Sequence, residues 1–102
     1  MLMFKEGVKI AGIRPETLLG MQLGASLFEA NGYGHFIVTS VLDGKHMDGS
    51  LHYKGLAFDL RIWTIPKGKI EEATNRLRLA LSPLGFQVVS ESNHIHIEFD
   101  PS

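Results

Sequence analysis

The sequence predicts a small α+β domain in which an antiparallel sheet carries two helices on one face. Three observations lead to this fold class. Two segments repeat apolar residues at helical spacing, several shorter segments alternate or are rich in β-branched residues, and the last two of these are separated by a short turn. A chain of 102 residues is expected to form one domain over 1–102, around one modest core.

The first half of the chain is expected to hold one helix and one strand after an extended segment over 1–13. Pro15 suits the first turn of a helix and Glu16 suits the positive end of its dipole, so a helix is predicted from there to Asn31-Gly32. The β-branched segment 35–40 then predicts a strand. The apolar residues that recur at helical spacing are Leu18, Leu19, Met21, Leu23, Leu27 and Phe28.

The middle of the chain is expected to contain a long loop, a strand and a second helix. Residues 41–54 show no sustained period, which is typical of a functional loop. A strand is predicted over 55–63, with Asp59 on the face opposite its large apolar residues. An amphipathic helix is predicted over 69–82, with a core line of Ile70, Ala73, Leu77 and Leu81.

The C-terminal end is expected to be a hairpin, with strands over 86–89 and 94–99 joined by a turn at Ser92-Asn93. Alternation in the final strand directs its apolar residues into the core and puts His94, His96 and Glu98 together on the opposite face. Two histidines at i and i+2 are an uncommon choice for a solvated strand. Both can approach the same metal or substrate.

Composition excludes several classes of partner. The net charge of −1 provides no long-range field for nucleic acid or anionic lipid. No apolar run approaches the length of a membrane span, and the absence of cysteine excludes disulfides and thiolate metal sites. The N-terminus is too short and interrupted for a signal peptide, so we expect cytoplasmic synthesis. We also expect a monomer with no nucleic-acid partner.

His52, Asp59 and His96 are the candidate metal ligands. An aspartate within an apolar strand is costly to bury unless it is paired or metal-bound, and Gly55 would let the chain bend back towards it from His52. Two imidazoles and a carboxylate suit zinc with a fourth position left open. The alternative is an ion pair of Asp59 with Arg61 or another basic residue. Two further histidines have no expected ligand role, and they are His35 and the loop residue His46.

Residues 50–59 read S-L-H-Y-K-G-L-A-F-D and residues 94–97 read H-I-H-I. These segments resemble the S-x-H-x-x-G-x-A-x-D and H-x-H signatures of the zinc D-alanyl-D-alanine carboxypeptidases and L-alanyl-D-glutamate endopeptidases. The resemblance covers nearly the whole chain and is to small single-domain members from bacteriophages and prophages. It implies a Hedgehog/DD-peptidase-like fold, Zn²⁺ held by His52, Asp59 and His96, and substrate contacts from Ser50 and His94. It also implies hydrolysis of peptide bonds in peptidoglycan stems or cross-links.

One departure from this family concerns the general base, which is an acidic residue three positions before the last ligand. Here that position is Asn93, and an amide does not accept a proton as a carboxylate does. Glu91 is one candidate for the catalytic role. A second reading shifts the register, so that residues 91–94 form E-x-x-H with His94 as the ligand. A third is a catalytically weak or inactive zinc-containing module that binds the cell wall or serves as a phage structural part.

A second departure concerns the substrate. Many relatives carry an arginine soon after the strand that corresponds to 35–40, where its fork can hold a substrate carboxylate. This chain has Val41 to Lys45 there, so Lys45 or Arg61 would have to substitute as a point charge. This favours an endolysin-like endopeptidase, acting on the wall after release or from the virion. A metal-free binding protein is the remaining alternative.

Overall fold

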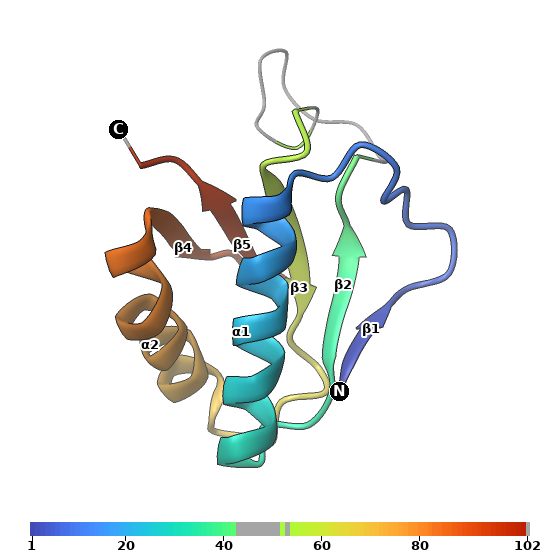
Figure 1. Ribbon diagram of the computed structural model, residues 1–102. Helices are drawn as coiled ribbons and strands as arrows, with labels where there is room; N and C mark the ends of the chain where they lie inside the picture. The colour runs from blue at the N-terminus through green and yellow to red at the C-terminus, as the bar shows by residue number, and fades with distance from the viewer. Residues whose placement is uncertain (43–51, 53, 102) are drawn as a thin grey trace.

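The computed structural model describes residues 1–42, 52 and 54–101, which form an α+β structure (Figure 1). Both predicted helices and the four predicted strands are confirmed, and most of their ends lie within one or two residues of the predicted positions. In chain order the elements are β1 (Leu2–Phe4), α1 (Pro15–Asn31), β2 (Phe36–Ser40), β3 (Ala57–Arg61), α2 (Ile70–Leu81), the short 3₁₀ helix η1 (Ser82–Leu84), β4 (Phe86–Ser90) and β5 (His94–Phe99).

The strands form one five-stranded sheet in the order β1-β2-β3-β5-β4. The pairs β2–β3, β3–β5 and β5–β4 are antiparallel, as predicted, but β1 pairs with β2 in parallel. The prediction of a purely antiparallel sheet is therefore wrong at this edge. A parallel neighbour needs a long crossover, and α1 supplies it between β1 and β2. The sequence signal was weak because β1 has only three residues.

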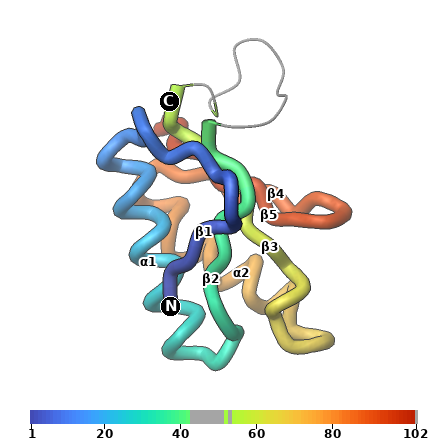
Figure 2. The backbone as a smooth tube through the Cα atoms, turned by 90° about the vertical axis from the view of Figure 1, so that its right-hand side faces the viewer, coloured from blue at the N-terminus to red at the C-terminus, as the bar shows by residue number. Residues whose placement is uncertain are grey.

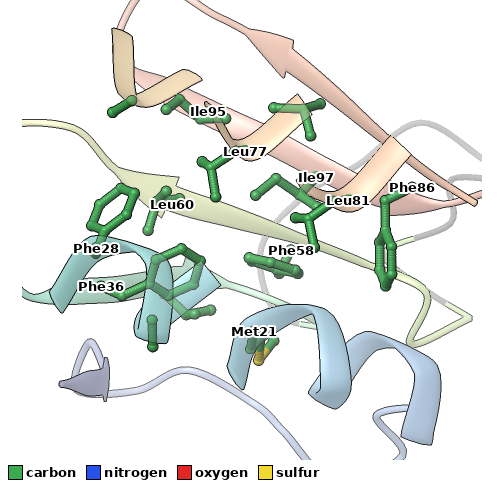
Figure 3. Close-up of a cluster of buried hydrophobic side chains, with 14 of the residues drawn as sticks. Met21, Phe28, Phe36, Phe58, Leu60, Leu77, Leu81, Phe86, Ile95 and Ile97 are labelled. Atoms are coloured by element: carbon green, nitrogen blue, oxygen red, sulfur yellow. The ribbon is translucent and has the colours of Figure 1, made fainter. Parts of the chain in front are cut away.

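Both helices cover the same face of the sheet (Figure 1). Their buried side chains meet those of the strands in one apolar cluster, which Figure 3 shows in close-up. Phe58 and Leu60 of β3 and Ile95 and Ile97 of β5 are completely buried in it. The predicted core line of α2 is confirmed, because Ala73, Leu77 and Leu81 are completely buried and Ile70 packs against the cluster. This apolar layer fixes the face on which polar side chains of the same strands remain.

The predicted apolar line of α1 is confirmed in part, because Met21 and Phe28 are completely buried and Leu27 packs against the cluster. The rest of the buried face differs from the prediction. Leu18, Leu19 and Leu23 are exposed, and the helix turns Gly20 and Gly24 towards the sheet. A Cβ at Gly24 would lie 2.5 Å from the Phe36 ring, and one at Gly20 would lie 2.7 Å from the ring of Phe86. The glycines therefore let two large aromatic rings pack against the helix backbone, and hydrophobicity alone could not indicate this.

The β4–β5 hairpin projects from the body on the side away from α1, as the turned view in Figure 2 shows. Its strands pair from Phe86 with Phe99 to Ser90 with Ile95, which confirms the predicted hairpin. The hairpin turn contains Asn93 and closes with a hydrogen bond from the Glu91 amide to the His94 carbonyl. Across the described ranges, no helix is long and apolar enough to cross a membrane.

Candidate metal centre

Two strands bring Asp59 and His96 together on the sheet face that the helices leave open. β3 and β5 are antiparallel neighbours, and their register pairs Asp59 directly with His96. Directly opposite residues in such a pair point to the same face. The large apolar neighbours of both residues are buried on the other face. The strand alternation predicted for both strands is thus confirmed.

His52 reaches the same place from a turn that ends at Gly55. The Gly55 amide donates to the His52 carbonyl at 3.0 Å, and Gly55 has a φ of +71°. A Cβ at Gly55 would lie 2.4 Å from the Gly12 carbonyl oxygen, so only glycine fits there. The Gly55 carbonyl is also fixed, because it accepts hydrogen bonds from the Arg14 amide and the Thr17 hydroxyl. The bend expected at Gly55 is confirmed, and it directs the 3% exposed His52 towards the sheet.

Three potential ligand atoms converge at this point and could hold a metal ion. His52 Nε2 lies 3.3 Å from Asp59 Oδ1 and 3.2 Å from His96 Nδ1, and His96 Nδ1 lies 3.1 Å from Asp59 Oδ1. A tetrahedral zinc site with ligand distances of about 2.0–2.1 Å has edges of about 3.3–3.4 Å. The three atoms therefore outline a triangle close in size to one face of that tetrahedron.

The proton arrangement of His52 supports this reading. Its Nδ1 lies 2.8 Å from the Val41 carbonyl oxygen, which can only accept a hydrogen bond. Nδ1 must therefore carry the hydrogen in the neutral ring, and Nε2 must present its lone pair to Asp59 and His96. A backbone carbonyl commonly orients a metal-binding histidine in this way.

Glu98 does the same for His96. Its Oε1 lies 3.1 Å from His96 Nε2, so this nitrogen donates and Nδ1 holds the lone pair in the neutral ring. Lone pairs of two imidazoles and of the Asp59 carboxylate then face one another with no hydrogen between them. Such an arrangement is repulsive unless a cation, either a metal ion or an extra proton, lies among the three atoms.

The pKa values of the site follow from the same contacts. Burial raises the pKa of Asp59, but the contacts with His52 and His96 and the charge of His94 outweigh it and hold the pKa well below its usual value. The protonated His96 ring can donate a hydrogen bond from Nδ1 to Asp59, which raises the pKa of His96; burial opposes this, and the Glu98 charge adds to it. Asp59 is thus ionised at neutral pH, and a proton on His96 competes with metal.

The other histidine of the H-x-H motif borders the site. His94 Nε2 lies 3.6 Å from Asp59 Oδ1, and His94 Nδ1 lies 2.6 Å from the Asn93 side-chain oxygen. Among the described residues, the group whose ligand atoms all lie within 4.8 Å of one another contains His96 and not His94. The geometry therefore favours the H-x-H register over E-x-x-H.

A cleft of about 180 Å³ opens beside Asp59 on the same face. Asn93 and His94 line it, whereas Glu91 does not, and Glu91 is exposed. Asp59 is therefore the acidic side chain of this cleft in the part of the chain that the structure describes. The catalytic roles expected of Glu91 and Asn93 stay predictions, as does the substrate role of His94.

The cleft also contains Arg61, which the sequence offered as a partner for Asp59 or for a substrate carboxylate, and three residues for which no role in the site was predicted. Thr39 enters through an irregularity in the β2–β3 pairing, where the register shifts between Val38 and Ser40, and bulges often occur beside functional sites. Lys5, Arg61 and Trp63 complete the wall. The sequence could indicate Arg61, because it follows Asp59 by two residues on the same strand face. It could not indicate that Lys5 and Thr39 line the cleft, because only the order of strands in the sheet brings them near Asp59.

Some residues named in the sequence predictions cannot be placed at the site or do not belong to it. Ser50, Lys45 and His46 lie outside the described residues. His35 is exposed and does not belong to the group of converging ligand atoms found among the described residues. The alternative of an ion pair between Asp59 and Arg61 is not seen; Asp59 instead contacts three histidines, which are the basic residues beside it.

No protein-family model, no curated protein and no solved structure matches this chain.

Proposed function

We propose that this protein is a zinc-dependent peptidase with a Hedgehog/DD-peptidase-like fold that hydrolyses peptide bonds in bacterial peptidoglycan. The single observation that carries the proposal is the convergence of three lone pairs from His52, Asp59 and His96 beside an open cleft. Two nitrogen ligands and one oxygen ligand suit zinc, and a three-ligand set leaves a position open, as in catalytic rather than structural zinc sites. Zinc bound in this way supplies a Lewis acid that lowers the pKa of water and polarises a peptide carbonyl.

The residues of the chain would divide the remaining tasks. Val41 and Glu98 hold the rings of His52 and His96 in the orientation that exposes their lone pairs. His94 offers Nε2 at the edge of the cleft, because its Nδ1 is engaged by Asn93. It is therefore suited to hydrogen-bond the substrate amide next to Asp59.

The choice of peptidoglycan rests on the signatures around His52 and His96, which resemble those of wall-cleaving zinc peptidases. In the endolysin-like reading, the protein acts on stems or cross-links after release from the cell or from a virion. The test is incubation of the zinc-loaded protein with purified peptidoglycan, followed by mass analysis of the released fragments. New amino and carboxyl termini are expected with the wild type and not with Asp59→Ala. Intact peptidoglycan with fully zinc-loaded wild type would contradict a peptidase role.

A second candidate function is a zinc-containing module that binds the wall or serves in a phage particle with little or no catalysis. The observation that favours it is the identity of residue 93, whose amide oxygen is hydrogen-bonded to His94 and cannot act as a base. No second carboxylate lines the cleft within the described ranges.

Asn93→Asp separates the two candidates. We expect this change to raise hydrolysis roughly 100-fold or more if the missing base limits the wild type, because general-base catalysis contributes about 10²–10⁴-fold. The control is Asn75→Asp, an exposed change on α2 that should leave hydrolysis unaltered. An inert wild type with an active Asn93→Asp variant supports the module. An active wild type that Asn93→Asp does not improve supports a base elsewhere, and Glu91→Gln then tests that residue.

A further inference from the structure

The outer side of α1, which faces away from the sheet, is apolar (Figure 1). Leu19, Leu23 and Ala30 are exposed there, and they share one side of the helix because whole helical turns separate them. Between Glu16 and Glu29 the helix has no charged residue. A helix that is apolar all round is normally buried all round, so α1 has a side for which the described part of the chain supplies no cover.

The other helix of the same layer has a different outer side. Four of the 12 residues of α2 are charged, and all four are exposed, whereas α1 has two charged residues among 17. These four are Glu71, Glu72, Arg76 and Arg78. Both helices cover the same face of the sheet, so the lack of charge on α1 is particular to this helix and needs its own explanation.

The apolar side of α1 continues onto α2. A hollow of about 280 Å³ between the helices is lined by Leu27 and Asn31 of α1 and by Arg76, Leu79 and Ala80 of α2. Leu27 follows Leu23 by one helical turn, and Leu79 is largely in solvent. We call Leu19, Leu23, Leu27 and Leu79 the leucine patch. A contiguous exposed apolar patch with polar residues at its rim marks an interaction surface.

The leucine patch has opposite charges at its two ends. Glu16 is exposed one turn before Leu19, and Arg76 is exposed in the hollow next to Asn31, at the other end of α1. Arg76 also lies 4.0 Å from Glu72 of its own helix, but an exposed pair of this kind contributes little. The order of acid, leucines and base is complementary to itself when it is reversed. A second copy of the chain turned by 180° presents this reversed order.

We propose that the leucine patch is the interface of a homodimer, formed about a twofold axis that passes beside Leu23. In such an isologous interface each contact occurs twice. Residues before Leu23 then lie opposite residues after it, so Leu19 faces Leu27 of the partner subunit. Glu16 is seven residues before the axis and faces the end of the partner's hollow that contains Asn31 and Arg76.

The size of the patch predicts a weak dimer. Its length along α1 is about 22 Å at 1.5 Å per residue, and it is two helices wide, at about 8–10 Å between helix axes. Interfaces below about 1,200 Å² in total are typical of transient complexes, so we expect a Kd on the order of 100 µM. The candidate metal centre lies on the sheet face that the helices leave open, so both copies keep it accessible in the dimer (Figure 1).

Sedimentation velocity of the full chain between about 5 µM and about 1 mM tests the proposal, since this range brackets the expected Kd. The wild type should change from one chain to two chains. Leu23→Glu should raise the Kd at least about tenfold, because it places two carboxylates together in an apolar contact at the axis. The matched control is Leu18→Glu, which alters a leucine of the same helix with 39% rather than 38% exposure. Leu18 lies about 140° around the helix from Leu23, so this variant should associate as the wild type does.

Exchange of the end charges tests the orientation of the two copies. Glu16→Lys and Arg76→Glu should each raise the Kd by about three- to tenfold, because the opposed pair becomes a like-charge pair at two places in the dimer. The double variant should return to within about twofold of the wild type. Restoration in the double variant supports the antiparallel twofold arrangement. Additive weakening in the double variant overturns it.

Two results of the sedimentation experiment overturn the dimer itself. One is a wild type that remains a single chain up to about 1 mM, as a monomer was expected from the sequence. The other is association that Leu23→Glu leaves unchanged while circular dichroism shows a normal fold. Flotation with phosphatidylcholine vesicles examines a different occupant. A monomeric wild type that binds these vesicles, and loses binding in Leu23→Glu, would assign the leucine patch to a lipid surface and contradict the homodimer.

Discussion

The two faces of β3 and β5 have opposite chemistry although alternating side chains of the same two strands build both. On the helix-covered face, Phe58, Leu60, Ile95 and Ile97 are completely buried and surrounded by apolar neighbours. On the open face, Asp59 lies within 3.3 Å of His52 and 3.1 Å of His96, and His96 lies 3.1 Å from Glu98. Exclusion of water from the helix-covered face stabilises the fold, whereas the open face holds polar groups whose lone pairs face one another.

The difference predicts which substitutions should mainly destabilise the fold and which should remove metal binding. Burial of apolar surface stabilises the domain by about 25 cal/mol per Å² and does not depend on any ligand. On the open face, two imidazoles and one carboxylate converge in a group that could hold a metal ion, so a metal bound there would add to the stability of the domain. Substitutions on the helix-covered face should therefore affect unfolding with little effect on metal binding. Those of the candidate ligands on the open face should remove metal binding and, with it, the stability that a bound metal adds.

The largest expected effect is loss of zinc binding in His52→Ala. Zinc binding to a four-coordinate site contributes about 10–16 kcal/mol, so loss of one ligand should weaken binding about 1,000-fold, or roughly 4 kcal/mol. Elemental analysis after dialysis against a weak chelator measures this. Asp59→Ala and His96→Ala should behave alike, and His35→Ala, which alters an exposed residue, should keep wild-type zinc.

His94→Ala sharpens the assignment within the open face. Its imidazole lies outside the group of converging atoms, so zinc should be retained. Loss of zinc in His94→Ala together with full retention in His96→Ala would move the ligand to the E-x-x-H register and contradict the ligand set proposed above.

The next effect is on the helix-covered face. Leu77→Ala should reduce the free energy of unfolding by about 3 kcal/mol, because it removes a completely buried side chain and leaves a cavity. Zinc stoichiometry should not change. Leu79→Ala, on the same helix but 78% exposed, is the matched control and should change stability by no more than about 0.5 kcal/mol. Denaturant unfolding measures both, and a Leu77→Ala protein that folds normally but loses zinc would contradict the separation of the faces.

Glu98→Gln should have a smaller effect confined to the open face. The substitution replaces the carboxylate that accepts a hydrogen bond from His96 Nε2 at 3.1 Å. Loss of such an orienting contact typically weakens metal binding about 10- to 100-fold. Competition with a chromophoric chelator measures the affinity. Glu71→Gln on the exposed side of α2 is the control. Equal zinc affinity in Glu98→Gln and the wild type would mean that His96 is oriented by other contacts.

The smallest expected effect is the pH dependence of the metal-free protein. The pKa of His96 is raised above 6.5 by Asp59, so its contribution to stability is complete below about pH 6.5 and is lost as pH rises through the raised pKa. The contribution is about 1.4 kcal/mol for each unit by which the pKa is raised. The pKa of Asp59 is lowered, so its contribution is present above about pH 4 and is lost in acid.

Unfolding in excess chelator at about pH 5.5 and about pH 8.5 measures this dependence. His96→Gln should remove the loss of stability on the alkaline side. Zinc affinity of the wild type should change in the opposite direction, rising with pH, because ligands must be deprotonated to bind metal. An identical pH dependence in the metal-free wild type and His96→Gln would contradict the pKa assignment.

The sequence alone determined the features that depend on local pattern. Helical spacing over 69–82 and strand alternation over 94–99 predicted α2 and β5 and the faces they present. The same alternation put Asp59 and His96 among the candidate ligands, because an aspartate in an apolar strand and histidines at i and i+2 are rare without a reason. Gly55 was predicted as a bend for its conformational freedom, and its left-handed backbone confirms it.

Only the tertiary structure decided what depends on neighbours distant in the chain. β1 is too short to show a pattern, and its parallel pairing exists because α1 returns the chain to β2. The Phe36 and Phe86 rings pack on the glycines of α1, and three of the leucines predicted for its core, Leu18, Leu19 and Leu23, are exposed. The Val41 carbonyl behind His52 and the stacking of Arg61 on Trp63 are likewise contacts in space. A periodic pattern reports the face of an element, but the partner that fills or faces it is fixed by packing of the whole chain.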